Sequence, residues 1–129
     1  MNAPFDLLLI DDHPMLRRGL AELFESSGEF RVVGSVSSGR EGIALARELN
    51  PALILLDLHM PGQGGLDTLE CLKRDQPEIS VMVLSASAAR EDVLPALRAG
   101  ADGYLLKDSE PEELLAAVSA CAHGQSRLD

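Results

Sequence analysis

Five short runs of apolar residues alternate along the chain with longer segments in which apolar residues recur every three or four positions. The short runs predict strands buried on both faces, and the longer segments predict helices that cover a sheet with one face. Strands and helices that alternate in this way indicate an α/β fold, a doubly wound parallel sheet with helices on both faces. The predicted strands lie at about 6–10, 30–34, 52–56, 79–84 and 100–106.

The predicted helices carry their own boundary signals. Asp12 is expected to cap the first helix, because Pro14 then falls in the first turn, where a missing N–H costs nothing. Ser38 and Glu41 predict a capping box for the second helix. The remaining helices are predicted at about 66–74, at about 88–98, and from the acidic segment 110–113 onward.

Acidic residues follow the first and third predicted strands. Asp11 and Asp12 come directly after the apolar run Leu7–Ile10, and Asp57 ends the run that begins after Pro51. Neighbouring parallel strands bring their carboxyl ends to one edge of the sheet, so these carboxylates are expected to converge where α/β sheets bind ligands. Three carboxylates repel one another unless a cation lies between them, and hard oxygen ligands suit Mg²⁺. The pattern therefore predicts a magnesium site.

A serine and a lysine are expected at the same edge. Ser85 follows the fourth predicted strand, and Lys107 follows the fifth. Taken singly, each residue has a common structural explanation. An acidic residue after a strand is more often a helix cap or turn residue, a serine is more often a turn residue, and a lysine more often lies on the solvated surface. The joint arrival of all five residues at one edge favours a functional site.

Composition narrows the class of protein. The 129 residues suit one domain, and neither a membrane-spanning apolar run nor a basic leader is present, which predicts a cytoplasmic protein that no membrane holds. A formal net charge of −10 argues against nucleic acid as a partner. Cys71 and Cys121 lack metal-ligand spacing and are expected to be thiols without chemistry. The polar segment 124–129 is expected to begin a linker, which leaves 1–123 as the domain.

Two other kinds of site find less support. Gly34, Gly39 and Gly42 match neither the dinucleotide-binding pattern nor a phosphate-binding loop. His13 and His59 lie near the acidic residues and would suit a transition metal, but hard carboxylates dominate there and favour Mg²⁺.

Four motifs follow one another along the chain, namely Leu9-Ile-Asp-Asp12, Leu56-Asp-Leu-His-Met-Pro61, Val83-Leu-Ser85 and Gly100-Ala-Asp-Gly-Tyr-Leu-Leu-Lys107. With these motifs the chain resembles a known family, the receiver domains of two-component response regulators. The last motif, followed by Pro111-Glu-Glu-Leu114, is most similar to the NarL/LuxR-type subgroup, whose members usually carry a C-terminal helix-turn-helix DNA-binding domain that is not expected within these residues. The resemblance implies a (βα)5 sheet of flavodoxin-like order 2-1-3-4-5.

The resemblance also implies site roles. Asp57 matches the phosphoacceptor, which takes a phosphoryl group from a sensor histidine kinase or a phosphotransfer protein. Asp12, Asp57 and the backbone carbonyl of His59 match the Mg²⁺ ligands, and Asp11 would reach the metal through water. Lys107 matches the lysine that holds a phosphoryl oxygen. Many receivers have a proline with a cis bond after this lysine, whereas Asp108 follows here, and a cis bond to a non-proline costs about 2.5–4 kcal/mol.

A conformational switch is implied as well. Ser85 matches a hydroxyl that moves toward the phosphoryl group, which would let Tyr104 turn inward as loop 86–91 moves. The face made by the fourth helix, last strand and last helix would then change shape. As the only tyrosine, Tyr104 could instead be half-buried core. Two positions match residues that tune dephosphorylation in the family, namely His59 and Ser87.

The implied function is a signalling switch that controls an output, transcription in this subgroup. The chain would assist only its own phosphorylation and dephosphorylation, and the sequence leaves open whether it forms a homodimer on phosphorylation. Two alternatives are an aspartate-nucleophile phosphatase and a receiver-like module that binds partners without phosphorylation. The phosphatase would need Asp-x-Asp at the first strand, which Asp11-Asp12-His13 does not fit. The presence of every site residue disfavours the unphosphorylated module.

Overall fold

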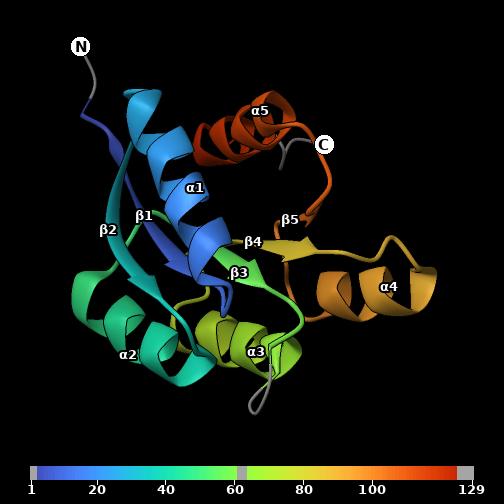
Figure 1. The fold of residues 1–129 in the computed structure, drawn as a ribbon. Coiled ribbons are helices and arrows are strands. Elements are labelled where there is room, and N and C mark those ends of the chain that lie inside the picture. Colours follow the sequence, from blue (N-terminus) through green and yellow to red (C-terminus); the bar gives the residue numbers. More distant parts are fainter. Residues whose placement is uncertain (1–2, 61–63, 125–129) are drawn as a thin grey trace.

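The computed structural model describes residues 3–60 and 64–124, in which strands and helices alternate strictly (Figure 1). Hydrogen bonds join the parallel strands in the order β2-β1-β3-β4-β5. The predicted fold class and strand order are therefore confirmed. The elements are β1 Phe5–Ile10, α1 Pro14–Ser26, β2 Phe30–Val36, α2 Gly39–Leu49, β3 Leu53–Asp57, α3 Gly65–Asp75, β4 Ser80–Ser85, α4 Arg90–Arg98, β5 Gly103–Leu106 and α5 Pro111–Ala122.

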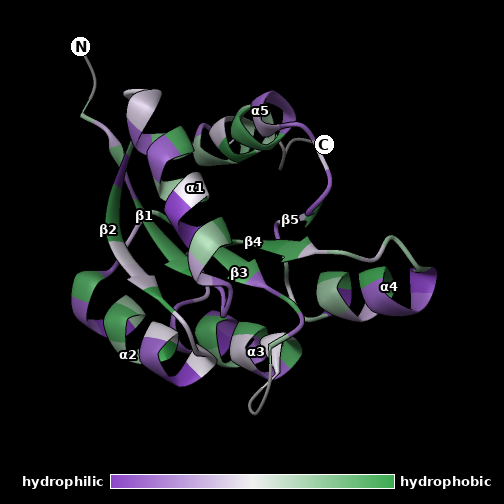
Figure 2. Ribbon diagram, viewed as in Figure 1, coloured by the Kyte–Doolittle hydropathy of each residue, from purple (hydrophilic) through white to green (hydrophobic). Residues whose placement is uncertain are grey.

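The sheet separates two apolar cores. On β1, Leu7 and Leu9 face the core covered by α1 and α5, whereas Leu8 and Ile10 face the core covered by α2, α3 and α4 (Figure 1). Every residue of β3 and β4 is buried, because both strands lie in the middle of the sheet between two helix layers. Figure 2 shows the apolar residues gathered on the strands and the inner sides of the helices. This double burial explains the unbroken apolar runs.

The predicted cap of α1 is wrong. The helix begins at Pro14, so His13 and not Asp12 holds the N-cap position, and no side chain caps this end. Proline is suited to the first helical position, which places the cap one residue later than predicted. The carboxylate of Asp11 instead accepts the backbone N–H of His13 at 2.8 Å.

Three other boundaries differ from the prediction. β2 continues past Gly34 to Val36, because Leu9 and Ile10 of β1 pair with Ser35 and Val36, beyond a register shift between Leu7 and Leu8. β5 begins only at Gly103, after a turn in which Gly100 has a positive φ of 104°. α4 begins at Arg90. Ser38 caps α2, accepting the N–H of Glu41 at 3.2 Å, but the predicted capping box is incomplete, because the Glu41 carboxylate accepts the backbone N–H of Ser37.

Two further predictions concern membrane spans and the linker. Among them, every helix is too short or too polar to cross a bilayer. The segment Pro61–Gln63 and all of the predicted linker except Gly124 lie outside the described residues.

The start of α3 packs against the chain just after Asp57. The N–H of Gly65 donates to the carbonyl of Leu58 at 3.0 Å. A Cβ at Gly65 would overlap the backbone of Leu58 and lie 2.6 Å from the carbonyl oxygen of Asp57. Only glycine allows this approach, which fixes the chain directly behind Asp57.

Gly65→Ala is expected to lower the free energy of unfolding by about 2 kcal/mol, since backbone must move to admit the methyl group. Urea denaturation measures the change. Gly64→Ala is the matched control, because a Cβ there meets nothing within 4 Å, and its cost should stay below about 1 kcal/mol. Equal losses in the two variants would contradict this account.

Candidate functional site

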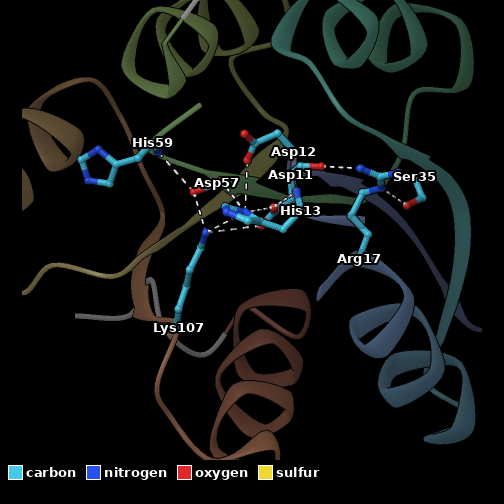
Figure 3. A network of polar contacts seen from close by, with 8 residues as sticks. All are labelled: Asp11, Asp12, His13, Arg17, Ser35, Asp57, His59 and Lys107. Atoms are coloured by element: carbon cyan, nitrogen blue, oxygen red, sulfur yellow. Dashed lines mark hydrogen bonds and ion pairs between the residues drawn. The ribbon is translucent and has the colours of Figure 1, made fainter. Parts of the chain in front are cut away.

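The carboxyl ends of β1 and β3 bring Asp11, Asp12 and Asp57 together, as predicted from the sequence (Figure 3). One oxygen from each, together with Nδ1 of His13, lie within 4.8 Å of one another. Asp57 is 1% exposed and Asp11 is 3% exposed, whereas the side chain of Asp12 is 26% exposed. These three aspartates and His13 are called the acidic cluster below.

Three oxygens of the acidic cluster are buried without a hydrogen-bond donor among the described residues, namely Asp11 Oδ2, Asp12 Oδ1 and Asp57 Oδ2. A buried carboxylate oxygen left without a donor carries a large desolvation cost. A divalent cation held by these oxygens would remove that cost, and a set of hard carboxylate oxygens suits Mg²⁺. The residues present therefore fit the magnesium site that the sequence predicts.

Lys107 provides a positive charge within the described site. Its Nζ lies 3.3 Å from Asp57 Oδ1 and 3.8 Å from Asp11 Oδ2. The backbone N–H of Lys107 donates to the carbonyl of Ser85 at 2.8 Å, which anchors the end of β5 beside β4. The Lys107–Asp108 peptide bond is trans. The lysine thus points at Asp57, where the sequence places it.

The environment of Asp57 favours its neutral form. Burial raises the pKa of Asp57 above its ordinary value of 3.8, and the charge of Asp11 raises it further. The backbone N–H of His59, 3.2 Å from Asp57 Oδ1, lowers the pKa, and so does Lys107, but burial and the charge of Asp11 together outweigh them. An ionised Asp57 is therefore costly until more positive charge arrives.

Ser85 and Tyr104 are joined through the loop that follows β4. Ser85 is fully buried, and its Oγ accepts the N–H of Ser87 at 3.0 Å. The hydroxyl of Tyr104 donates to the carbonyl of Ser87 at 2.7 Å. The Ser87 hydroxyl donates to Asp92 Oδ2 in α4 at 2.7 Å. Tyr104 is half-buried against the core, so it combines a packing role with this polar contact.

The two histidines near the cluster occupy different places. The imidazole of His13 lies among the three carboxylates, whereas that of His59 is exposed and points away from them (Figure 3). The sequence made both histidines candidate ligands of a transition metal, but only His13 belongs to the acidic cluster. Pro14 is the sequence feature that could have predicted this position of His13. Proline suits the first residue of a helix, so His13 becomes the N-cap residue between the end of β1 and α1.

Two residues, Arg17 and Asp92, were missed by sequence reasoning. Arg17 donates from a guanidinium nitrogen to the carbonyl of Asp11 at 2.7 Å and from Nε to Ser35 Oγ at 3.1 Å (Figure 3). This bridge holds the turn after β1 against the end of β2. Asp92 likewise fixes loop 86–91 through Ser87. Neither residue stands at a strand end, so the rule that found the other site residues does not reach them.

Comparison with known proteins agrees with this geometry. The response regulator receiver domain family matches residues 7–119. The chain belongs to this receiver domain family. It is 52% identical over 125 residues to the nitrate/nitrite response regulator protein NarL of Escherichia coli K12, covering 97% of the chain and 58% of that protein. It is 39% identical over 123 residues to the transcriptional regulatory protein LiaR of Bacillus subtilis, covering 95% of the chain and again 58% of the relative.

A solved receiver domain has the same fold. The signal receiver domain of a response regulator named NarL from Mycobacterium tuberculosis superposes with a TM-score of 0.90 at 33% identity, over 95% of this chain and 99% of that one. The chain is thus a NarL-type receiver of two-component systems, and it spans about 58% of the length of the curated relatives it matches. Those relatives are regulators by name. Receiver domains generally bind Mg²⁺ at an acidic pocket, and in this structure three aspartates gather in the acidic cluster.

Asp57→Asn is expected to raise the free energy of unfolding by on the order of 1 kcal/mol in chelator-treated protein, because it removes a buried charge. The folded-state pKa of Asp57 exceeds its unfolded value, so the charge destabilises fully above the folded pKa and not at all below the unfolded one. The gain should therefore shrink as pH falls.

Urea denaturation of both proteins from neutral to acidic pH measures this difference. Asp108→Asn, which removes an exposed carboxylate beside Lys107, is the control and should change little. If Asp57→Asn instead lowered the free energy of unfolding at neutral pH, the conclusion that the buried charge of Asp57 destabilises the fold would be refuted.

Proposed function

We propose that this receiver is a phosphorylation switch in which Asp57 accepts a phosphoryl group from a phosphohistidine. The position of Asp57 carries the proposal. It ends the central strand at 1% exposure, with Lys107 Nζ 3.3 Å from one oxygen and the other oxygen facing Asp11, Asp12 and His13. One carboxylate thus has a cation on one side and a metal-binding group on the other.

The transfer forms one bond and breaks another. Asp57 Oδ1 attacks phosphorus, the phosphorus–nitrogen bond of the phosphohistidine breaks, and the donor imidazole leaves with the electron pair. Such transfers need positioning and charge neutralisation more than covalent chemistry. Asp12, Asp57 and the backbone carbonyl of His59 would hold Mg²⁺, and Asp11 would reach it through water. The bound ion would neutralise charge on the phosphoryl oxygens. Lys107 holds a phosphoryl oxygen as a point charge.

The new group then acts on Ser85. A phosphoryl group adds about −1.5 to −2 charge and strong acceptor oxygens, which attract the Ser85 hydroxyl. That hydroxyl now accepts the N–H of Ser87, whose carbonyl holds Tyr104. Movement of Ser85 therefore loosens loop 86–91 and frees Tyr104 to turn inward, which reshapes the face of α4, β5 and α5. His59 and Ser87 set how readily water reaches the acyl phosphate.

The partners follow from this chemistry. A sensor histidine kinase or a phosphotransfer protein supplies the phosphoryl group, and the phosphorylated chain forms a homodimer. The output is control of transcription, in keeping with the name of the Bacillus subtilis relative. The domain acts in the cytoplasm, ends near residue 123 and itself binds no nucleic acid.

Incubation with phosphoramidate and Mg²⁺ is expected to add the mass of one phosphoryl group to the intact protein. Asp57→Asn should add none, whereas Asp108→Asn should behave as the parent protein, since Asp108 is exposed and outside the acidic cluster. Intact-mass spectrometry gives the answer. An unmodified parent protein that still binds Mg²⁺ would refute the switch and favour a module that acts without phosphorylation.

Tyr104→Phe should speed amide hydrogen exchange in loop 86–91 of the unphosphorylated protein by about fivefold, because it removes one hydrogen bond of about 1 kcal/mol while keeping the ring. Exchange followed by mass spectrometry measures this. Ser119→Ala, which removes a hydroxyl that contacts Glu29 far from the loop, should leave that exchange unchanged. Unaltered protection in Tyr104→Phe would show that the hydroxyl does not restrain the loop.

A further inference from the structure

His13 occupies an unusual position within the acidic cluster. Its Nδ1 lies 2.9 Å from Asp11 Oδ1, 3.1 Å from Asp12 Oδ1 and 3.7 Å from Asp57 Oδ2 (Figure 3). Two of these oxygens, those of Asp12 and Asp57, are among the buried atoms without a hydrogen-bond donor. One imidazole nitrogen thus faces oxygens that a metal ion would need.

This nitrogen acts as a donor toward the carboxylates. Carboxylate oxygens only accept hydrogen bonds, so the contact with Asp11 requires a proton on Nδ1. Lys107 Nζ, 3.3 Å from the same nitrogen, also only donates. The imidazole and the ammonium therefore both donate toward the carboxylates and do not bond each other. A metal ion would instead need the lone pair of Nδ1.

A divalent ion that binds these carboxylates has two ways to meet His13. It can take Nδ1 as a further ligand, or it can displace the imidazole. The side chain is 57% exposed, so a path outward into solvent lies open. The backbone of His13 is fixed through its N–H, which donates to Asp11 Oδ1 at 2.8 Å, and through its carbonyl, which accepts the N–H of Arg17 at 3.0 Å, so displacement would involve rotation of the side chain alone.

The nature of the ion decides between these two outcomes. Mg²⁺ is small and hard, requires near-octahedral oxygen ligands and keeps several waters. It gains little from an imidazole and needs the space that the ring fills. Co²⁺ binds imidazole well and stands higher than Mn²⁺ in the affinity order for nitrogen and oxygen sites. It gains a ligand where Mg²⁺ meets a competitor.

We propose that His13 is the metal-selecting residue of the acidic cluster: its imidazole is displaced by Mg²⁺ and retained as a ligand by Co²⁺. The inference rests on the magnesium site of the proposed function. The side chain of His13 would thus lower the affinity of the acidic cluster for Mg²⁺ and raise its affinity for ions that prefer imidazole, such as Co²⁺.

Isothermal titration calorimetry of the parent protein and His13→Ala with Mg²⁺ and with Co²⁺ tests the proposal. Loss of the imidazole should tighten Mg²⁺ binding by about fivefold, since one competing contact of about 1 kcal/mol disappears. It should weaken Co²⁺ binding by about tenfold or more, since a ligand is lost. His59→Ala is the matched control, because that exposed imidazole points away from the cluster (Figure 3), and both affinities should stay unchanged.

A spectroscopic signature separates ligation from general electrostatics. In the Co²⁺-loaded protein, proton NMR should show one exchangeable, paramagnetically shifted imidazole N–H, from Nε2 of His13. The signal should persist in His59→Ala and vanish in His13→Ala. Circular dichroism checks the fold of each variant, and His13→Ser, which keeps a good N-cap residue for α1, replaces His13→Ala if that protein does not fold.

The outcomes are distinguishable. Opposite shifts for the two ions, together with the lost N–H signal, support the proposal. Shifts in the same direction, or none, overturn the role of His13 while leaving the magnesium site intact. A parent protein that binds no Mg²⁺ overturns the magnesium site and this inference with it.

Discussion

The repulsion among the carboxylates of Asp11, Asp12 and Asp57 is the interaction on which the rest of the site depends. Asp11 and Asp57 are almost fully buried, and burial together with the charge of Asp11 raises the pKa of Asp57. The ammonium of Lys107 offsets part of this charge from within the chain. The oxygens left without a donor mark the part that is not offset, and they explain why this site would take up a metal ion.

The fold holds these charges in place by packing around them. Asp11 and Asp57 follow strands whose apolar side chains fill both cores of the sheet, so neither aspartate can withdraw without disturbing the sheet. Gly65 brings α3 onto the backbone behind Asp57, and Arg17 ties the turn after Asp11 to β2. The loop that carries Ser87 is held mainly by a few hydrogen bonds. The rigid part thus binds charge, and the loosely held part is suited to move in response.

Much of this could be predicted from the sequence, because apolar runs locate buried strands and parallel topology brings their carboxyl ends together. That reasoning placed Asp11, Asp12, Asp57, Ser85 and Lys107 at one edge of the sheet. It did not place the imidazole of His13 among the carboxylates, because that depends on where α1 begins. The contacts of Tyr104 and Asp92 with Ser87 depend on the path of a loop, and hydrophobic periodicity carries no information about that path.

The central claim, that the acidic cluster is short of positive charge which Mg²⁺ supplies, is tested most directly by the free energy of unfolding measured over a range of Mg²⁺ concentrations at constant ionic strength. An ion that binds one site of the folded protein should stabilise it by about 1.4 kcal/mol for each tenfold increase above its dissociation constant. The account predicts this slope for the parent protein and a much smaller one for Asp57→Asn. A free energy of unfolding that does not change with Mg²⁺, or an equal slope in both proteins, would contradict it.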